Sequence, residues 1–137
     1  MADLVITPNS VRPQALTPLT AVQFGEAVTP GVVLYRSSSD NKYYKSDCDA
    51  TSTADIDGIA MSHGSADEYG YVYNSRNTKL DLSVTLTTGT AYVVSDTAGN
   101  IMPDTDLTSG QQLSIIGYGD ADGLLSYQPN VTGLAKP

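Results

Sequence analysis

Short apolar runs separated by turn residues recur from residue 20 to residue 128, and this spacing constrains the fold more than any other feature of the chain. The 12 glycines and 7 prolines separate these runs, and the nine Tyr residues suit half-buried pleated surfaces. Runs that recur about every 8 to 12 residues are typical of sandwiches and barrels. The pattern therefore predicts an all-β chain that forms a small antiparallel β-barrel or β-sandwich-like domain. We expect strands within 20–24, 32–36, 42–46, 57–62, 69–74, 82–87, 91–95, 112–118 and 123–128.

One of these runs is echoed later in the chain. The stretch "TPGVVLYRS" (29–37) aligns with "TTGTAYVVS" (87–95), and a polar turn and a second strand-like run follow each copy. Two copies are too few for a solenoid, which needs at least about three repeats. The echo indicates either a pair of duplicated hairpins in one domain or a chance similarity between hairpins.

Residues 1–19 differ from the single β domain that we expect over 20–137. Pro8, Pro13 and Pro18 hold this segment extended and exclude a helix. The segment is also more apolar than a solvated tail requires, and a disordered terminus is the alternative. We therefore expect an extended N-terminal arm that docks through apolar residues, namely Leu4, Val5, Ile6, Val11 and Leu16.

Few residues in the chain suit catalysis or cofactor binding. His63 is the sole histidine and follows Ser62, but residues so close in sequence seldom reach triad geometry. Cys48, the only cysteine, lies between Asp47 and Asp49, whose charges oppose thiolate formation. We therefore expect no catalytic residue, no cofactor and no enzymatic activity.

Three acidic pairs, "DCD", "DID" and "DAD", suggest calcium only weakly. A calcium loop needs several oxygen ligands at fixed positions, and "DIDG" (55–58) supplies only a fragment of one. Solvated turns explain the three pairs better, and a weak cation site between subunits is the alternative. We predict no metal site.

Fifteen acidic and seven basic residues give a net charge of -8. This charge disfavours nucleic acid, because affinity for phosphates comes from Lys and Arg. The N-terminus lacks the features of a signal peptide, and no apolar run approaches the roughly 20 residues of a membrane span. With no disulfide possible, we expect synthesis in a reducing cytoplasm and no membrane partner.

Tyr69, Tyr71 and Tyr73 alternate along one expected strand and should share a face. Such a stripe lines a core or a subunit interface, where the hydroxyl groups keep polar partners. Stacking on sugars is the alternative. We assign these three residues to a subunit interface.

The pattern over residues 20–130 resembles that of the capsid decoration (cement) proteins of tailed bacteriophages. The shared features are a "G-x-x-V-x-x-G" entry, an "A-D…-G-I-A" stretch and a late "L-x-x-G-x-x-Y-x-V-S-x-x-A-G" hairpin. The matching residues are Gly25, Val28 and Gly31; Ala54, Asp55, Gly58, Ile59 and Ala60; and Leu86, Gly89, Tyr92, Val94, Ser95, Ala98 and Gly99. The arm lies outside this shared pattern.

The resemblance implies a structural protein on the outer surface of a phage head, which stabilises the lattice of the major capsid protein. It also implies a homotrimer, made in the host cytoplasm and carried on the virion. A receptor- or carbohydrate-binding module of a head or tail fibre is the alternative function. Within the arm, Leu4, Val5 and Ile6 precede the first proline and keep their backbone donors, so we predict that they contact the capsid.

Overall fold

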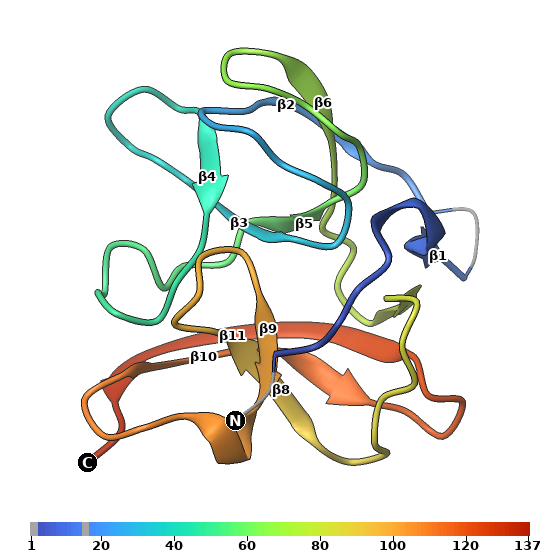
Figure 1. The fold of residues 1–137 in the computed structure, drawn as a ribbon, viewed down its shortest axis with the longest axis vertical. Coiled ribbons are helices and arrows are strands. Elements are labelled where there is room, and N and C mark those ends of the chain that lie inside the picture. The colour runs from blue at the N-terminus through green and yellow to red at the C-terminus, as the bar shows by residue number, and fades with distance from the viewer. Residues whose placement is uncertain (1–2, 15–16) are drawn as a thin grey trace.

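Two antiparallel β-sheets packed on one another make up the fold in a computed structural model that describes residues 3–14 and 17–137. The all-β prediction is confirmed, and of its two alternatives the sandwich is correct, since the sheets do not form a closed barrel. Figure 1 shows the five-stranded sheet above the six-stranded sheet, with the N-terminal segment in blue passing from one to the other. No α-helix occurs in the described ranges.

The five-stranded sheet has the order β2-β6-β5-β3-β4. Its strands are β2 (Thr20–Gln23), β3 (Val33–Arg36), β4 (Tyr43–Lys45), β5 (Gly58–Ala60) and β6 (Tyr69–Tyr73). A single bridge between Phe24 and Tyr43 joins its two edge strands. The sheet therefore curls around an apolar cluster of its own, which includes Phe24, Leu34 and Val72.

The six-stranded sheet has the order β1-β7-β11-β10-β8-β9. Its strands are β1 (Arg12–Pro13), β7 (Thr78–Asp81), β8 (Ala91–Val94), β9 (Ile101–Pro103), β10 (Gln112–Gly119) and β11 (Leu125–Ala135). Two short 3-10 turns, η1 (Pro8–Ser10) and η2 (Asp104–Asp106), complete the elements.

The main core lies between the sheets. Val33, Ile59 and Tyr73 of the five-stranded sheet are fully buried in one cluster with Val94 and Ile116 of the six-stranded sheet. Alternation along each strand explains this arrangement, because successive side chains point to opposite faces. A third, smaller cluster on the other face of the six-stranded sheet contains Cys48, Val93, Met102 and Leu107.

The turn of the β8–β9 hairpin, around Gly99, connects the two sheets. The Gly99 N–H donates to the Ser46 carbonyl (2.7 Å), and the Val33 N–H donates to the Gly99 carbonyl (3.0 Å). Gly99 has a φ of +83°, and a Cβ there would lie 3.2 Å from both Lys45 and Val32. A positive φ and a close approach both favour glycine. This hairpin is therefore a scaffold element that braces the sandwich.

The two echoed stretches occupy corresponding places in the two sheets. β3 pairs with the edge strand β4, and β8 pairs with the edge strand β9, in both cases antiparallel. Gly31 and Gly89, two residues before β3 and β8, both have positive φ. This agreement in position favours the interpretation of duplicated hairpins over chance.

One predicted strand is absent, and another is longer than predicted. Residues 82–87 are not a strand, because Ser83 has a φ of +68° and its N–H donates to the Asp81 carboxylate (2.8 Å). The strand at this place is β7, just before that turn. The last predicted strand, 123–128, in fact continues as β11 to Ala135, past Pro129 and Gly133.

Candidate functional site

The N-terminal arm is held against the body of its own chain by polar contacts along its length. At its start, the Asp3 carboxylate accepts hydrogen bonds from Ser95 Oγ (2.7 Å) and Asn100 Nδ2 (2.9 Å). The Leu4 N–H donates to the Ile101 carbonyl of β9 (2.8 Å). These contacts fix the first described residues of the arm to the β8–β9 hairpin.

Further along, the arm contacts the segment between β5 and β6 and also strand β7 of the six-stranded sheet. The Thr7 N–H donates to Ser83 Oγ (2.7 Å), and the Asn9 side chain lies 2.8 Å from His63 Nε2. β1 then pairs with β7 through Arg12–Asp81 and Pro13–Leu80. The arm therefore connects the six-stranded sheet to the turn that carries His63 and back again.

The apolar residues of the arm point in two directions. Leu4, Ile6 and Val11 are half-buried and pack against the main core, whereas Val5 is 86% exposed. Leu16 lies outside the described residues. The arm thus docks on its own chain, and of the four described residues that we assigned to a capsid contact only Val5 faces solvent. The capsid contact itself stays a prediction.

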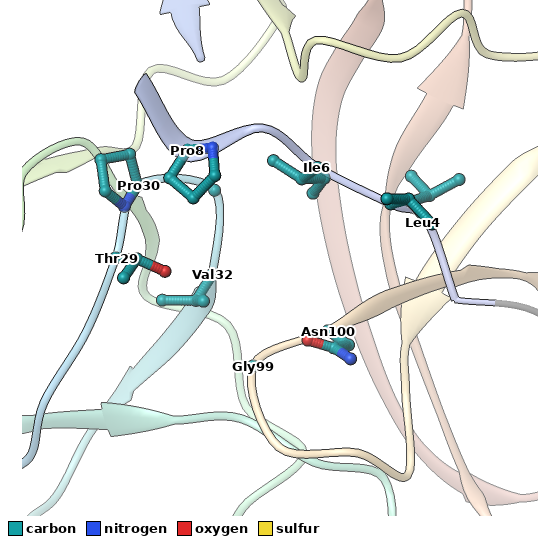
Figure 2. Close-up of a pocket in the computed structure, with 10 residues that line it drawn as sticks. Leu4, Ile6, Pro8, Thr29, Pro30, Val32, Gly99 and Asn100 are labelled. Carbon is teal, nitrogen blue, oxygen red and sulfur yellow. The ribbon is translucent and has the colours of Figure 1, made fainter. Parts of the chain in front are cut away.

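A cavity of about 230 Å³ lies between the arm and the turns of both sheets. Figure 2 shows Leu4 and Ile6 on the arm opposite Val32 and the Gly99–Asn100 turn. Gly31 forms part of the wall and has a φ of +96°, and a Cβ there would lie only 2.8 Å from Ile6 Cγ2. Glycine at this position therefore allows Ile6 of the arm to pack closely against it. The sequence Pro30-Gly31 indicates a turn but not this contact with the arm.

The three stripe tyrosines of β6 do not share one environment. Tyr69 and Tyr71 are 77% and 52% exposed, whereas Tyr73 is fully buried. Tyr73 packs edge-on against Tyr127 of β11 (ring centroids 5.3 Å apart) and hydrogen bonds to Thr78, and burial raises its pKa. The second sheet covers only the end of β6 that carries Tyr73. Tyr73 is thus a core residue and is not available to a subunit interface, for which Tyr69 and Tyr71 remain.

His63 and Cys48 have no catalytic arrangement in the described part of the chain. His63 is exposed and contacts Asn9, while the Ser62 hydroxyl accepts the Tyr71 N–H (3.0 Å). Cys48 is fully buried, and burial, followed by the charges of Asp49 and Asp96, raises its pKa to about 12. A thiol with this pKa is inert at neutral pH.

In two of the three acidic pairs, a carboxylate accepts hydrogen bonds from within the chain. Asp47 Oδ1 accepts from the Asp49 N–H (3.1 Å) and from Thr53 Oγ1 (2.8 Å). Asp57 Oδ2 accepts from the Arg36 N–H (2.7 Å), and desolvation by burial raises the pKa of this carboxyl group. No group of three or more side chains suited to a metal ion occurs within residues 3–14 and 17–137.

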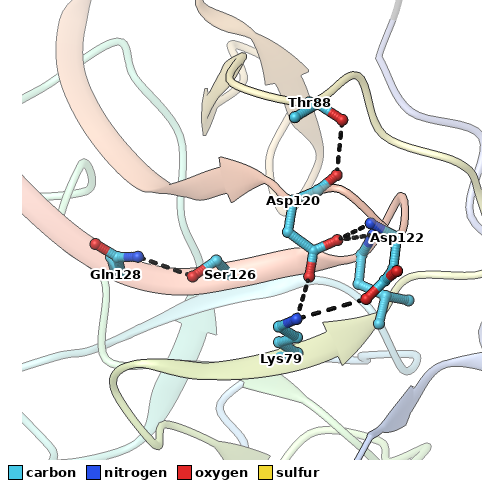
Figure 3. Close-up of polar contacts among 7 residues, drawn as sticks. Lys79, Thr88, Asp120, Asp122, Ser126 and Gln128 are labelled. Carbon is cyan, nitrogen blue, oxygen red and sulfur yellow. Dashed lines mark hydrogen bonds and ion pairs between the residues drawn. The ribbon is translucent and has the colours of Figure 1, made fainter.

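The third pair closes the turn between β10 and β11. Asp120 Oδ1 accepts from the backbone N–H groups of Asp122 (2.8 Å) and Leu124 (2.9 Å), and the hydrogen bond from Leu124 contributes most to lowering the pKa of this carboxyl group. Lys79 of β7 pairs with both carboxylates, at 3.1 Å and 3.6 Å. Figure 3 shows this network beside the start of β11, where Gln128 donates to Ser126. The network ties β7 to the first residues of β11.

A second surface, which the sequence predictions missed, follows along β11. β7 pairs only with Leu125–Tyr127, so Gln128–Ala135 pairs with β10 alone among the described strands. Val131 and Leu134 on this segment are 41% and 68% exposed. We call Gln128–Ala135 the open edge. Pro129 and Gly133 suggested a loop, but the lack of any charged residue from Gly123 to Ala135 was a signal that could have identified it.

No family model, curated protein or solved structure matches this chain. Across the residues that the structure describes, no helix has the length and apolar character needed to cross a membrane.

Proposed function

We propose that this protein is a structural decoration protein that binds the outer surface of a phage head and stabilises the lattice of the major capsid protein. The observation that carries the proposal is Val5, an apolar side chain that is 86% exposed on a backbone anchored on both sides. Asp3 and Leu4 hold one side and Thr7 holds the other. Because the backbone on both sides of Val5 is already held, burying this side chain against another protein would cost little further ordering entropy.

The cross-braced body supports the same role. The Gly99 turn and the arm each connect the two sheets, so a load applied at one sheet reaches the other through packed and hydrogen-bonded contacts. Residues of the shared sequence pattern contribute to this bracing, among them Gly31 and Gly99. The proposed role is mechanical and requires no cofactor.

The proposal is tested by cosedimentation of the protein with purified capsids that lack it. We expect the wild type to bind and Val5→Asp to bind at least ten-fold more weakly, because a carboxylate in an apolar contact is desolvated without a partner. Ala121→Asp adds the same charge at an exposed turn and is the matched control. Failure of the wild type to bind would refute the proposal.

We further propose a homotrimer on the capsid, with Tyr69 and Tyr71 at the subunit interface. Both side chains are exposed on β6 beside β2, where Tyr69 is opposite Gln23 and Tyr71 is opposite Ala21. Because a net charge of -8 opposes self-association, the lattice rather than the free protein would assemble three copies. Capsid-bound copies that lie singly, away from any three-fold arrangement in an electron-microscopy reconstruction, would contradict the trimer.

The same two tyrosines favour a second candidate function, carbohydrate binding by a fibre module. Exposed aromatic rings on one strand face can stack on sugar rings. Binding of the isolated protein to a glycan array, lost in Tyr69→Ala and Tyr71→Ala and without affinity for capsids, would support this alternative over decoration.

A further inference from the structure

We infer that the open edge of β11, Gln128–Ala135, receives an extended, non-acidic segment of the capsid partner as an added β-strand. This inference rests on the proposed function and names a second contact surface, separate from Val5. The open edge pairs with β10 on one side only, so the backbone groups on its other side have no strand partner among the described residues. Before the bend at Gly133, the five residues Gln128–Thr132 span about 17 Å, which is an ordinary length for a strand.

Hollows flank the open edge on both faces of the sheet. Val131 lines a cavity of about 530 Å³, together with Tyr35, Arg36 and Asp55. Leu134 lines a cavity of about 470 Å³ on the opposite face, beside Leu113. Val131 pairs with Ser114 of β10, so these two side chains share a face, on which Ser114 Oγ donates to the Ala54 carbonyl. Leu113 is the residue before Ser114, so its side chain lies on the opposite face.

These hollows define the side chains of the added strand. The first is lined largely by hydroxyl groups and by one base and one acid, Arg36 and Asp55, so it suits a polar side chain. The second is lined mainly by apolar residues, namely Leu113, Leu134, Ala135 and Pro137, with Asp104 and Lys136 also in its wall, so it suits an aliphatic side chain. Since successive side chains of a strand point to opposite faces, a segment that alternates polar and aliphatic residues would fill both hollows.

Charge favours a foreign segment over a second copy of this chain. The open edge carries no charged residue, but each copy has a net charge of -8, and two copies repel one another at long range. In a dimer formed through this edge, both paired strands would also carry the same two features that interrupt strand pairing. Pro129 has no N–H to donate, and Gly133, with a φ of +70°, bends the strand. A non-acidic segment of another protein avoids both costs.

The test compares two edge variants with a matched control in cosedimentation with purified capsids that lack the protein. Val131→Lys and Leu134→Lys each place a charge beside the open edge, on opposite faces. Tyr118→Lys is the control, since Tyr118 is 37% exposed and Val131 41%. We expect both edge variants to bind at least ten-fold more weakly than the wild type and the control to bind normally, with thermal unfolding midpoints unchanged in all three. Amide hydrogen exchange of residues 128–135 should slow on the capsid.

The outcomes separate this inference from the proposed function. If the wild type binds and both edge variants bind equally well, the edge inference is wrong while decoration stands. If the wild type does not bind, decoration is wrong and the edge inference with it. If sedimentation equilibrium of the free protein shows a dimer that Val131→Lys abolishes, the open edge pairs with a second copy, and the foreign segment is wrong.

Discussion

Two strand edges of the six-stranded sheet, at β9 and at the later part of β11, differ in whether another segment of the chain covers them. At β9 the chain's own arm covers the edge, with the Leu4 N–H on the Ile101 carbonyl and the Asp3 carboxylate on the adjacent hairpin. Along Gln128–Ala135 no described strand covers the outer side of β11. Unpaired strand edges invite association, and proteins blunt them with charges, proline or bulges. Here the open edge has Pro129 and a bend at Gly133 but no charge, so it is only partly blunted.

One extended segment of the chain thus covers an edge of this sheet, whereas another extended segment is left without a described strand on its outer side. The apolar composition of the arm predicted that it docks on a partner. Most of its described apolar side chains instead pack against the core of the same chain. From these contacts we expect the covered edge to be tightly held and the open edge to be accessible.

The largest expected effect concerns Cys48, which joins the five-stranded region to the covered end of the six-stranded sheet. Its N–H donates to the Ser95 carbonyl (3.1 Å), and its carbonyl accepts from the Gln112 N–H (2.8 Å). Because the side chain is buried and its pKa is about 12, a thiol reagent at pH 8 should react about 1,000-fold more slowly than in urea-unfolded protein. Labelling as fast as in urea would show that this end opens freely.

Replacing Gly31 by Ala should unseat the arm. The added Cβ would meet Ile6 at 2.8 Å in a backbone with positive φ, and we expect a loss of about 3 kcal/mol in the free energy of unfolding. Gly110→Ala is the control, because Gly110 has a φ of +88° with open space around it, so only about 1 kcal/mol should be lost. Urea denaturation measures both, and equal losses would mean that the arm contributes nothing at Gly31.

The neighbouring residues Val5 and Ile6 also test how the arm packs against the core. Ile6→Ala should lower the free energy of unfolding by about 1.5 kcal/mol, since Ile6 is half-buried against the core. Val5→Ala should change it by less than about 0.5 kcal/mol, because Val5 is exposed. If both changes cost the same in urea denaturation, the in-and-out alternation of the arm is wrong.

The smallest effect is expected near the open edge, at Asp57, whose Arg36 partner lines the polar hollow. Burial raises the pKa of Asp57, so the folded state binds its proton more tightly than the unfolded state. Its contribution to stability is therefore present at low pH and lost as the pH rises from the usual carboxyl range through the raised value. Asp57→Asn keeps the acceptor for the Arg36 N–H and should stabilise the protein at pH 7, by less than about 1 kcal/mol after solvent screening.

Urea denaturation at pH 4 and pH 7 measures this effect. The gain from Asp57→Asn should be larger at pH 7 than at pH 4. A gain that is larger at pH 4 would mean that the Asp57 carboxylate is stabilised, rather than destabilised, by folding.

Local patterns in the sequence were sufficient for the fold class and for the chemical character of several residues. Alternating runs and turn residues predicted the strands, because side-chain period and turn chemistry act over a few residues. The acidic neighbours were also expected to oppose ionisation of the Cys48 thiol, and after burial the charge of Asp49 is the next cause that raises its pKa. The strand predicted at 82–87 failed because the backbone of Ser83 adopts a positive φ that its residue type does not demand.

Which of these surfaces are exposed could not be predicted from local patterns, because it depends on contacts between distant segments. Tyr69, Tyr71 and Tyr73 are identical in type and spacing, yet the second sheet reaches only Tyr73. Leu4 and Val5 are neighbours of similar hydropathy, but one packs against the core and the other faces solvent. The open edge exists because β7 leaves β11 after Tyr127. The exposure of a side chain depends on which distant segments pack beside it. Local sequence patterns therefore predicted the strand-forming and apolar character of each segment, but not which of its side chains are buried.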